Sequence, residues 1–270
     1  MTTHTFKLPS GVECEVKPLI GKHQRMLTEQ KNSNLSENLN EVLADVITRV
    51  GSNTNIDKQF VLGMLAIDRK KALVEVRQFT MDFEPTFVFD YDYKNRLGEK
   101  ASFPFQVDLS DGFNEVPLKK WGKLKTDEGE TETWIDCEYK EYAEIEKTIY
   151  ITLPKSGSEV RFNLLDGHGE LRGMTTPKNQ RSSHTAILMR NPQYKAPTKK
   201  GGDVWIQLNL DNLPYKDIEI LRATIKQVEG SIDTEFIFEH PEAEFKSAGE
   251  KDVTVDLVGQ LAFFFPSQAI

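Results

Sequence analysis

The chain has 270 residues, a formal net charge of −8, and 38% hydrophobic and 28% charged residues. This apolar content is enough for a packed core and argues against wholesale disorder. The acidic balance makes the chain a poor candidate for binding the nucleic-acid backbone, which needs clustered lysine and arginine. No apolar run approaches the roughly 18 residues of a membrane span, so we expect no membrane partner.

The start of the chain and its cysteines indicate the compartment. The segment MTTHTFKLPSG lacks the charged-then-apolar pattern of a secretory signal. Cys14 and Cys137 lie far apart, which argues against a disulfide framework. The five histidines are dispersed and form no zinc-binding spacing with the cysteines. We therefore expect a soluble protein of a cytoplasm-like compartment, with no metal and no other cofactor.

Two stretches of the chain read alike, FKLPSGVECEVKPL at 6–19 and ITLPKSGSEVRFNL at 151–164. Further landmarks follow in the same order in both copies, and a repeated order of landmarks indicates a duplication. They are the acidic residues Asp68 and Asp217, the strand starts Thr86 and Thr234, and the Val-Asp-Leu segments 107–109 and 255–257.

These landmarks predict an α+β fold built from two tandem, diverged repeats. The first repeat spans 1–117 and the second spans 146–270, with a charged linker at 118–145 between them. Each repeat is expected to contain an N-terminal β-hairpin, a helical middle and a C-terminal finger of two β-strands.

In the first repeat we expect strands at 5–8 and 12–17, because apolar and charged residues alternate there around the turn Pro9-Ser10-Gly11. Apolar residues at helical spacing then predict three helices. The first runs from Ser36, its cap, to Gly51; the second covers about 57–65; the third covers about 68–79, with Asp68 as its cap. A finger follows at 86–109, turning at 95–98.

The segment KLKTDEGETETW is charged and poor in apolar residues, so it reads as a linker or an exposed loop. In the second repeat, residues 175–200 read as a long loop around a short apolar helix at 185–189. A helix is expected at 215–228, ending near Gly230, and the second finger turns through 241–249.

No catalytic constellation stands out. The Asp-Gly-His-Gly segment at 166–169 reads as a turn, and the chain has neither a phosphate-binding loop nor a nucleophile elbow. Asp90 and Asp92 would face one side of a strand, where they form either a cation site or a solvated face; we favour the solvated face. We therefore expect a protein that is not an enzyme.

The C-terminal run LAFFFP is more informative. Each aromatic side chain gains roughly 1.5–3 kcal/mol on full burial, so the run belongs either in the chain's own core or against another chain. The 175–200 loop is a second contact candidate, because long loops tend to be contact surfaces. The predicted partner-interface residues are Phe263, Phe264, Phe265, Pro266, Leu261, His184 and Met189.

The order of short motifs resembles a known family. An LPSG hairpin at 8–11, the helix motif LP..D...LR at 213–222, a two-stranded finger and a terminal FF.P together look like the baseplate hub subunit and tail-assembly family of T-even-like contractile-tailed bacteriophages. Similar sequences often carry CxxC pairs in the finger, whereas the turns 91–98 and 240–249 contain no cysteine, so zinc is not carried over.

The resemblance implies a non-enzymatic structural subunit of the virion tail baseplate, made in the host cytoplasm. Its partners would be other tail proteins in a symmetric hetero-oligomeric assembly. Three alternatives stay open: an assembly chaperone that is absent from the mature virion, a metal-dependent or carbohydrate-active enzyme that uses Asp90 and Asp92, and a small-molecule or peptide-binding module built on the fingers. An apolar cleft between the repeats would favour the binding module.

Overall fold

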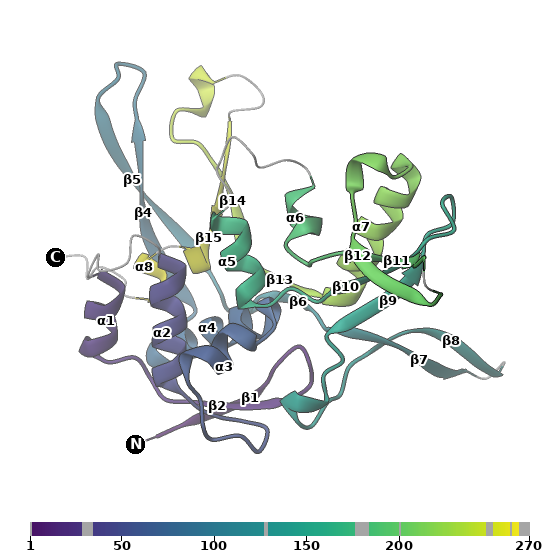
Figure 1. The fold of residues 1–270 in the computed structure, drawn as a ribbon. Helices are drawn as coiled ribbons and strands as arrows, with labels where there is room; N and C mark the ends of the chain where they lie inside the picture. Colours follow the sequence, from purple (N-terminus) through teal and green to yellow (C-terminus); the bar gives the residue numbers. More distant parts are fainter. Residues whose placement is uncertain are drawn as a thin grey trace.

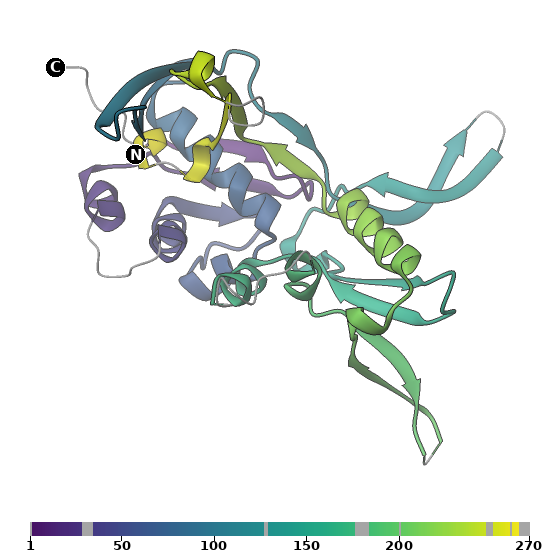
Figure 2. The same ribbon diagram turned by 90° about the horizontal axis from the view of Figure 1, so that it is seen from above.

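The computed structural model describes residues 2–28, 35–126, 129–175, 184–199, 201–246, 251–259 and 261–264. The fold is α+β, as predicted, and consists of helices packed against small antiparallel sheets (Figures 1 and 2). Among the described helices, none has the length and apolar character needed to cross a membrane.

The first part of the chain contains, in order, β1 (His4–Lys7), β2 (Glu13–Val16), α1 (Gly21–Thr28), α2 (Leu35–Val46), β3 (Ile47–Val50), α3 (Lys58–Gly63), α4 (Ala66–Thr80), β4 (Thr86–Lys94), β5 (Lys100–Asp108), β6 (Asn114–Val116), β7 (Lys119–Thr126) and β8 (Gly129–Asp136). The second part contains β9 (Thr148–Thr152), β10 (Glu159–Asn163), α5 (Gly167–Thr175), α6 (Thr185–Leu188), β11 (Gln193–Pro197), β12 (Asp203–Gln207), α7 (Tyr215–Glu229), β13 (Ser231–Asp233), β14 (Glu235–Glu239), β15 (Asp252–Asp256) and α8 (Leu261–Phe264).

The N-terminal sheet has the strand order β1-β2-β3. Cys14 and Val16 are buried in β2, whereas Glu13 is exposed, as the alternation predicts. The predicted helix 36–51 is wrong at its end, because α2 stops at Val46 and the chain continues as β3. The backbone there pairs with β2, placing Val50 opposite Cys14. Sheet pairing therefore overrides the helical spacing of the last apolar residues.

An aspartate in the first turn of a helix holds the hairpin turn of each part. The backbone N–H of Ser10 donates to Asp68 Oδ1 at 3.0 Å. In the second part, the N–H groups of Lys155 and Ser156 donate to the two carboxylate oxygens of Asp217 at 2.9 and 2.8 Å. Asp68 is the third residue of α4 and Leu65 is the N-cap, so the prediction that Asp68 caps this helix is wrong.

The predicted linker at 118–145 contains a β-hairpin instead. Strands β7 and β8 pair along their whole length, with Trp121 opposite Trp134. Oppositely charged side chains meet across the hairpin, as between Lys119 and Asp136, whose charged atoms are 3.8 Å apart. Such cross-strand pairs stabilise a hairpin that buries few apolar side chains.

The predicted loop at 175–200 contains the short helix α6, as expected, but also the strand β11. Together β9 to β12 form a sheet with the order β12-β11-β10-β9. Residues 176–183 and Lys200 of the predicted loop lie outside the described residues.

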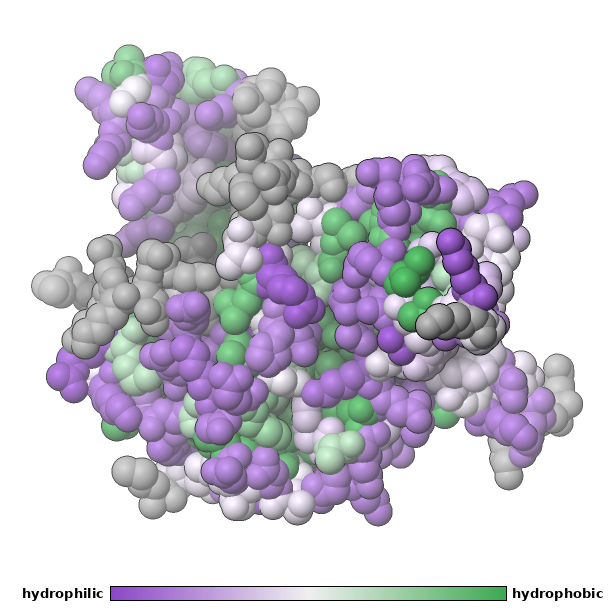
Figure 3. Space-filling model, in the orientation of Figure 1, coloured by the Kyte–Doolittle hydropathy of each residue, from purple (hydrophilic) through white to green (hydrophobic). Residues whose placement is uncertain are grey.

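The two predicted fingers are present as the hairpins β4–β5 and β14–β15. They lie side by side (Figures 1 and 2), and aromatic rings pack between them. The ring centroid of Phe238 lies 5.6 Å from that of Phe89 and 4.4 Å from that of Phe105. Figure 3 shows hydrophobic and hydrophilic side chains mixed on the projection that these fingers form.

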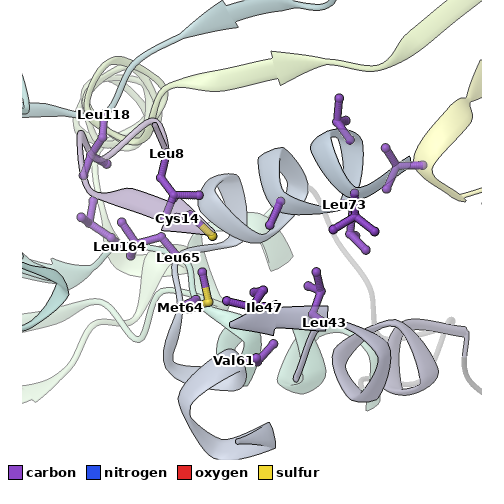
Figure 4. Packing of buried hydrophobic residues seen from close by; sticks show 14 of the residues in the cluster. Leu8, Cys14, Leu43, Ile47, Val61, Met64, Leu65, Leu73, Leu118 and Leu164 are labelled. Atoms are coloured by element: carbon purple, nitrogen blue, oxygen red, sulfur yellow. The ribbon is translucent and has the colours of Figure 1, made fainter. Parts of the chain in front are cut away.

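The two parts of the chain share a core. Strand β6 pairs with β13, and the N–H of Ala66 donates to the carbonyl of Leu165 at 2.8 Å. One hydrophobic cluster contains buried residues of both parts, among them Leu8, Leu65, Leu118 and Leu164 (Figure 4). The parts therefore pack on each other, whereas the duplication and its boundaries stay predictions.

Candidate functional site

The structure places two of the predicted interface residues in the chain's own core. Phe263 and Phe264 are fully buried. The Phe263 ring packs against Phe87 at 5.6 Å between centroids, and the guanidinium of the buried Arg77 lies 5.2 Å from the Phe263 ring centroid. Arg77 Nε also donates to the Phe263 carbonyl at 3.2 Å. Neither ring is available to a partner, so their assignment to an interface is corrected.

The other predicted interface residues stand as follows. Leu261 begins α8, and its side chain lies outside the described part, as do Phe265 and Pro266. His184 and Met189 flank α6 and are half-buried. Met189 packs over Gly173, where an added Cβ would lie 2.5 Å from its sulfur. The role of His184 and Met189 in an interface stays a prediction.

Aromatic side chains that are exposed or half-buried gather instead on the β7–β8 hairpin and the neighbouring sheet. Trp121 and Trp134 form an edge-to-face pair with 5.2 Å between ring centroids, and 57% of Trp121 is exposed. Tyr150 on β9 is 60% exposed and lies 5.8 Å from Trp205 on β12. Arg161 on β10 lies 4.7 Å from the Trp205 ring centroid.

We call these five residues the tryptophan surface. It contains all three tryptophans of the chain. Tryptophan, tyrosine and arginine are the residues that most often dominate the binding energy of protein interfaces. Because exposed aromatic clusters are costly in water, this surface is a candidate contact site.

A cavity of about 230 Å³ lies within the tryptophan surface. Trp121 and Trp134 contribute one wall, and Thr148, Ile149 and Tyr150 of β9 contribute another. Three consecutive residues of one strand can line a cavity together only at the edge of a sheet, since neighbouring side chains point to opposite faces. The cavity therefore lies between the edge of β9 and the β7–β8 hairpin.

The fingers carry a second set of exposed apolar side chains, at the opposite end of the molecule (Figure 1). We call it the finger surface; its residues are Val88, Leu97, Phe103, Ile237 and Phe245. The two finger tips are joined, because the Arg96 N–H donates to Glu242 at 3.0 Å and its guanidinium lies 4.5 Å from the Phe245 ring centroid.

An apolar cleft of about 540 Å³ lies between the two parts of the chain. Leu65 and Leu73 of α4 line one side, and Leu164 and Ile232 line the other. Arg69 and Glu170 form an ion pair at this cleft. The sequence could not show such a cleft, because its walls come from segments far apart in the chain.

Asp90 and Asp92 lie exposed on β4, on the same side of the strand, as the alternation predicts. Within the described ranges, no group of three or more histidine, cysteine, aspartate or glutamate residues is placed to hold a metal ion.

The sequence interpretation missed the tryptophan surface and named the fingers only in the alternative of a small-molecule or peptide-binding module. The only signal for the tryptophan surface was the set of three tryptophans, and these lie up to 84 positions apart, from 121 to 205. Comparison with protein families, with curated proteins and with solved structures finds no match for this chain.

Proposed function

We propose that this chain is a structural subunit of a bacteriophage tail baseplate, at the junction of hub and wedge, where it bridges neighbouring tail proteins. One observation carries the proposal beyond the family resemblance. The tryptophan surface and the finger surface lie at opposite ends of the molecule (Figure 1). A subunit that joins two neighbours needs two separate contact surfaces of this kind.

The shared core supports this role. A bridging subunit transmits force only if its two ends belong to one rigid body. Here each of the two surfaces takes residues from both parts of the chain, and the β6–β13 pairing and the common hydrophobic cluster connect these parts.

Chemical cross-linking of purified particles tests the bridge. Lys120 and Lys123 lie on β7 near the tryptophan surface, and Lys94 and Lys100 lie opposite each other on the β4–β5 finger. We expect amine-reactive cross-linkers to join the two pairs of lysines to different tail proteins. Cross-links from one end only, in particles that contain the chain, would contradict bridging.

A tail-assembly chaperone is the alternative within the same biology, and the same two surfaces would then serve transient contacts. The apolar cleft between the two parts favours a further candidate, a small-molecule or peptide-binding module. Native mass spectrometry of the chain purified from infected cells distinguishes this module, because it predicts a bound small molecule in stoichiometric amount.

A further inference from the structure

The outer edge of β9 carries backbone hydrogen-bonding groups that have no partner strand within the described part of the chain. β9 is the last strand in the order β12-β11-β10-β9, and no described strand pairs with its outer side. The N–H of Leu153 donates to Ser158, and the N–H of Leu164 donates to Lys147. In an antiparallel ladder these bonds place the odd-numbered residues of β9 against β10. The N–H and C=O groups of Thr148, Tyr150 and Thr152 therefore point outward.

This free edge faces the cavity of the tryptophan surface. Thr148, Ile149 and Tyr150 line the cavity from the strand side, and Trp121 and Trp134 line it from the hairpin side. An extended peptide at this edge would form main-chain hydrogen bonds with β9 and could place a side chain in the aromatic cavity. Backbone pairing and a side-chain pocket are the two components of recognition by strand addition.

The lining of the cavity indicates the chemistry of the added strand. Lys119 and Lys120 line the cavity together with Glu146. The Lys120 ammonium lies over the Tyr139 ring at 4.9 Å, and Lys119 lies 3.8 Å from Asp136. Asp136 and Glu146 balance the two lysines, so the charges favour neither an acidic nor a basic ligand, whereas the aromatic walls favour an apolar side chain in the cavity.

We propose that the outer edge of β9 binds an extended segment of another polypeptide, which adds a strand to the sheet and inserts an apolar side chain between Trp121, Trp134 and Tyr150. The proposal deepens the bridging role, since it names the chemistry of one of the two neighbours. The test of strand addition uses the isolated chain, whereas the test of bridging uses purified particles. Strand addition can therefore be refuted without refuting bridging, and the reverse.

The experiment selects nonapeptides from a displayed random library on the intact purified chain, followed by counter-selection on the Trp121→Ala variant. Trp121 is 57% exposed, so this variant keeps the fold. We expect the surviving peptides to share a central apolar residue and to lack proline, which cannot donate a main-chain hydrogen bond to β9. Their affinity should fall at least tenfold on Trp121→Ala and should not change on Tyr215→Ala, a matched aromatic control that is 68% exposed at the start of α7.

Hydrogen exchange with a selected peptide then tests the strand geometry. In the free chain, the amides of Ile149 and Ile151 should exchange slowly and the amide of Tyr150 rapidly. The peptide should slow the Tyr150 amide at least tenfold and leave Ile149 and Ile151 unchanged.

Three results would overturn the proposal. The first is that no peptide survives counter-selection. The second is that the survivors are proline-rich and leave the Tyr150 amide unprotected. The third is that the Tyr150 amide is already protected in the free chain and that sedimentation shows this free chain to be a dimer. A second copy of the chain would then occupy the edge of β9.

Discussion

At the scale of single residues, Asp68 and Asp217 hold equivalent hairpin turns but differ in their preferred protonation. Both side chains are buried. Burial raises the pKa of Asp68 to about 6, and the hydrogen bond from Ser10 only partly offsets this effect. Burial also disfavours the Asp217 carboxylate, but the N–H groups of Lys155 and Ser156 together outweigh it and lower the pKa. Burial therefore dominates at Asp68, whereas the hydrogen-bond donors dominate at Asp217.

Asp68→Asn is predicted to remove a pH dependence of stability. A carboxyl whose folded pKa lies above its unfolded value of about 3.9 loses stability as the pH rises through the folded pKa. For Asp68 the loss amounts to about 3 kcal/mol between roughly pH 4 and pH 7, from about 2 pKa units at 1.36 kcal/mol each. Urea unfolding at several pH values gives the free energy of unfolding of the variant and of the unmodified chain. The variant's value minus that of the unmodified chain should rise by this amount as the pH increases from about 4 to 7. A constant difference would contradict the assignment.

Asp217→Asn is predicted to act in the opposite direction. The lowered pKa means that the ionised carboxylate stabilises the fold above its unfolded pKa, and that this stability is lost as the pH falls. An asparagine keeps one acceptor oxygen for two N–H donors. The variant should therefore be less stable at pH 7, and the deficit should shrink toward pH 3 in the same unfolding experiment. A deficit that grows on acidification would refute this account.

At the scale of elements, the sequence predicted those structures whose burial follows a simple period. The finger β4–β5 and the helix α7 lie close to their predicted bounds, because apolar side chains recur every second residue in the one and on one helical face in the other. β7–β8 and β3 were missed, since β7–β8 depends on cross-strand charge pairs and β3 on pairing with a distant strand. Neither interaction is visible in a local window of sequence.

Gly230→Ala is predicted to disrupt the joint between the two parts. Gly230 ends α7 with φ of +65°, and a Cβ there would lie 2.2 Å from the Val116 carbonyl oxygen. Gly157→Ala is the matched control, because its φ is +68° but nothing lies within 4 Å of the added Cβ. We expect chemical denaturation to show a cost of about 1–2 kcal/mol for the control, from backbone strain alone, and a clearly larger cost for Gly230→Ala. Equal costs would show that β6 and β13 do not meet as described.

Phe263→Ala is predicted to destabilise the fold by about 3–5 kcal/mol, because it opens a cavity in the core beside Phe87 and Arg77. Phe245→Ala, which removes an exposed ring and its contact with Arg96, should cost no more than about 1 kcal/mol in the same thermal or chemical unfolding assay. A mild effect of Phe263→Ala on stability would mean that the Phe263 ring is not part of the core and is available to a partner. Deletion from Leu261 onward is therefore a test of folding before it is a test of assembly.

At the scale of the whole molecule, the contact surfaces could not be predicted from sequence. The tryptophan surface combines residues of β7, β8, β9, β10 and β12, and only the packed hairpins bring them together. The sequence interpretation placed contacts in the apolar C-terminal run, because an apolar run shows the need for burial but not its location. The structure meets that need within the chain for Phe263 and Phe264.

The shared core predicts a single cooperative unfolding transition. All three tryptophans lie between positions 121 and 205, whereas helices and strands extend over both parts. Tryptophan fluorescence and far-ultraviolet circular dichroism should therefore report the same midpoint in urea. Two separated transitions would mean that the parts fold independently and that the chain is not the rigid connector that bridging requires.

The most direct test of the central claim is quantitative mass spectrometry of purified phage particles beside the infected-cell lysate. A structural baseplate subunit predicts several copies of this chain in every particle, at a constant ratio to other tail proteins. Abundance in the lysate together with absence from the particles would contradict the claim and would make the chain an assembly factor.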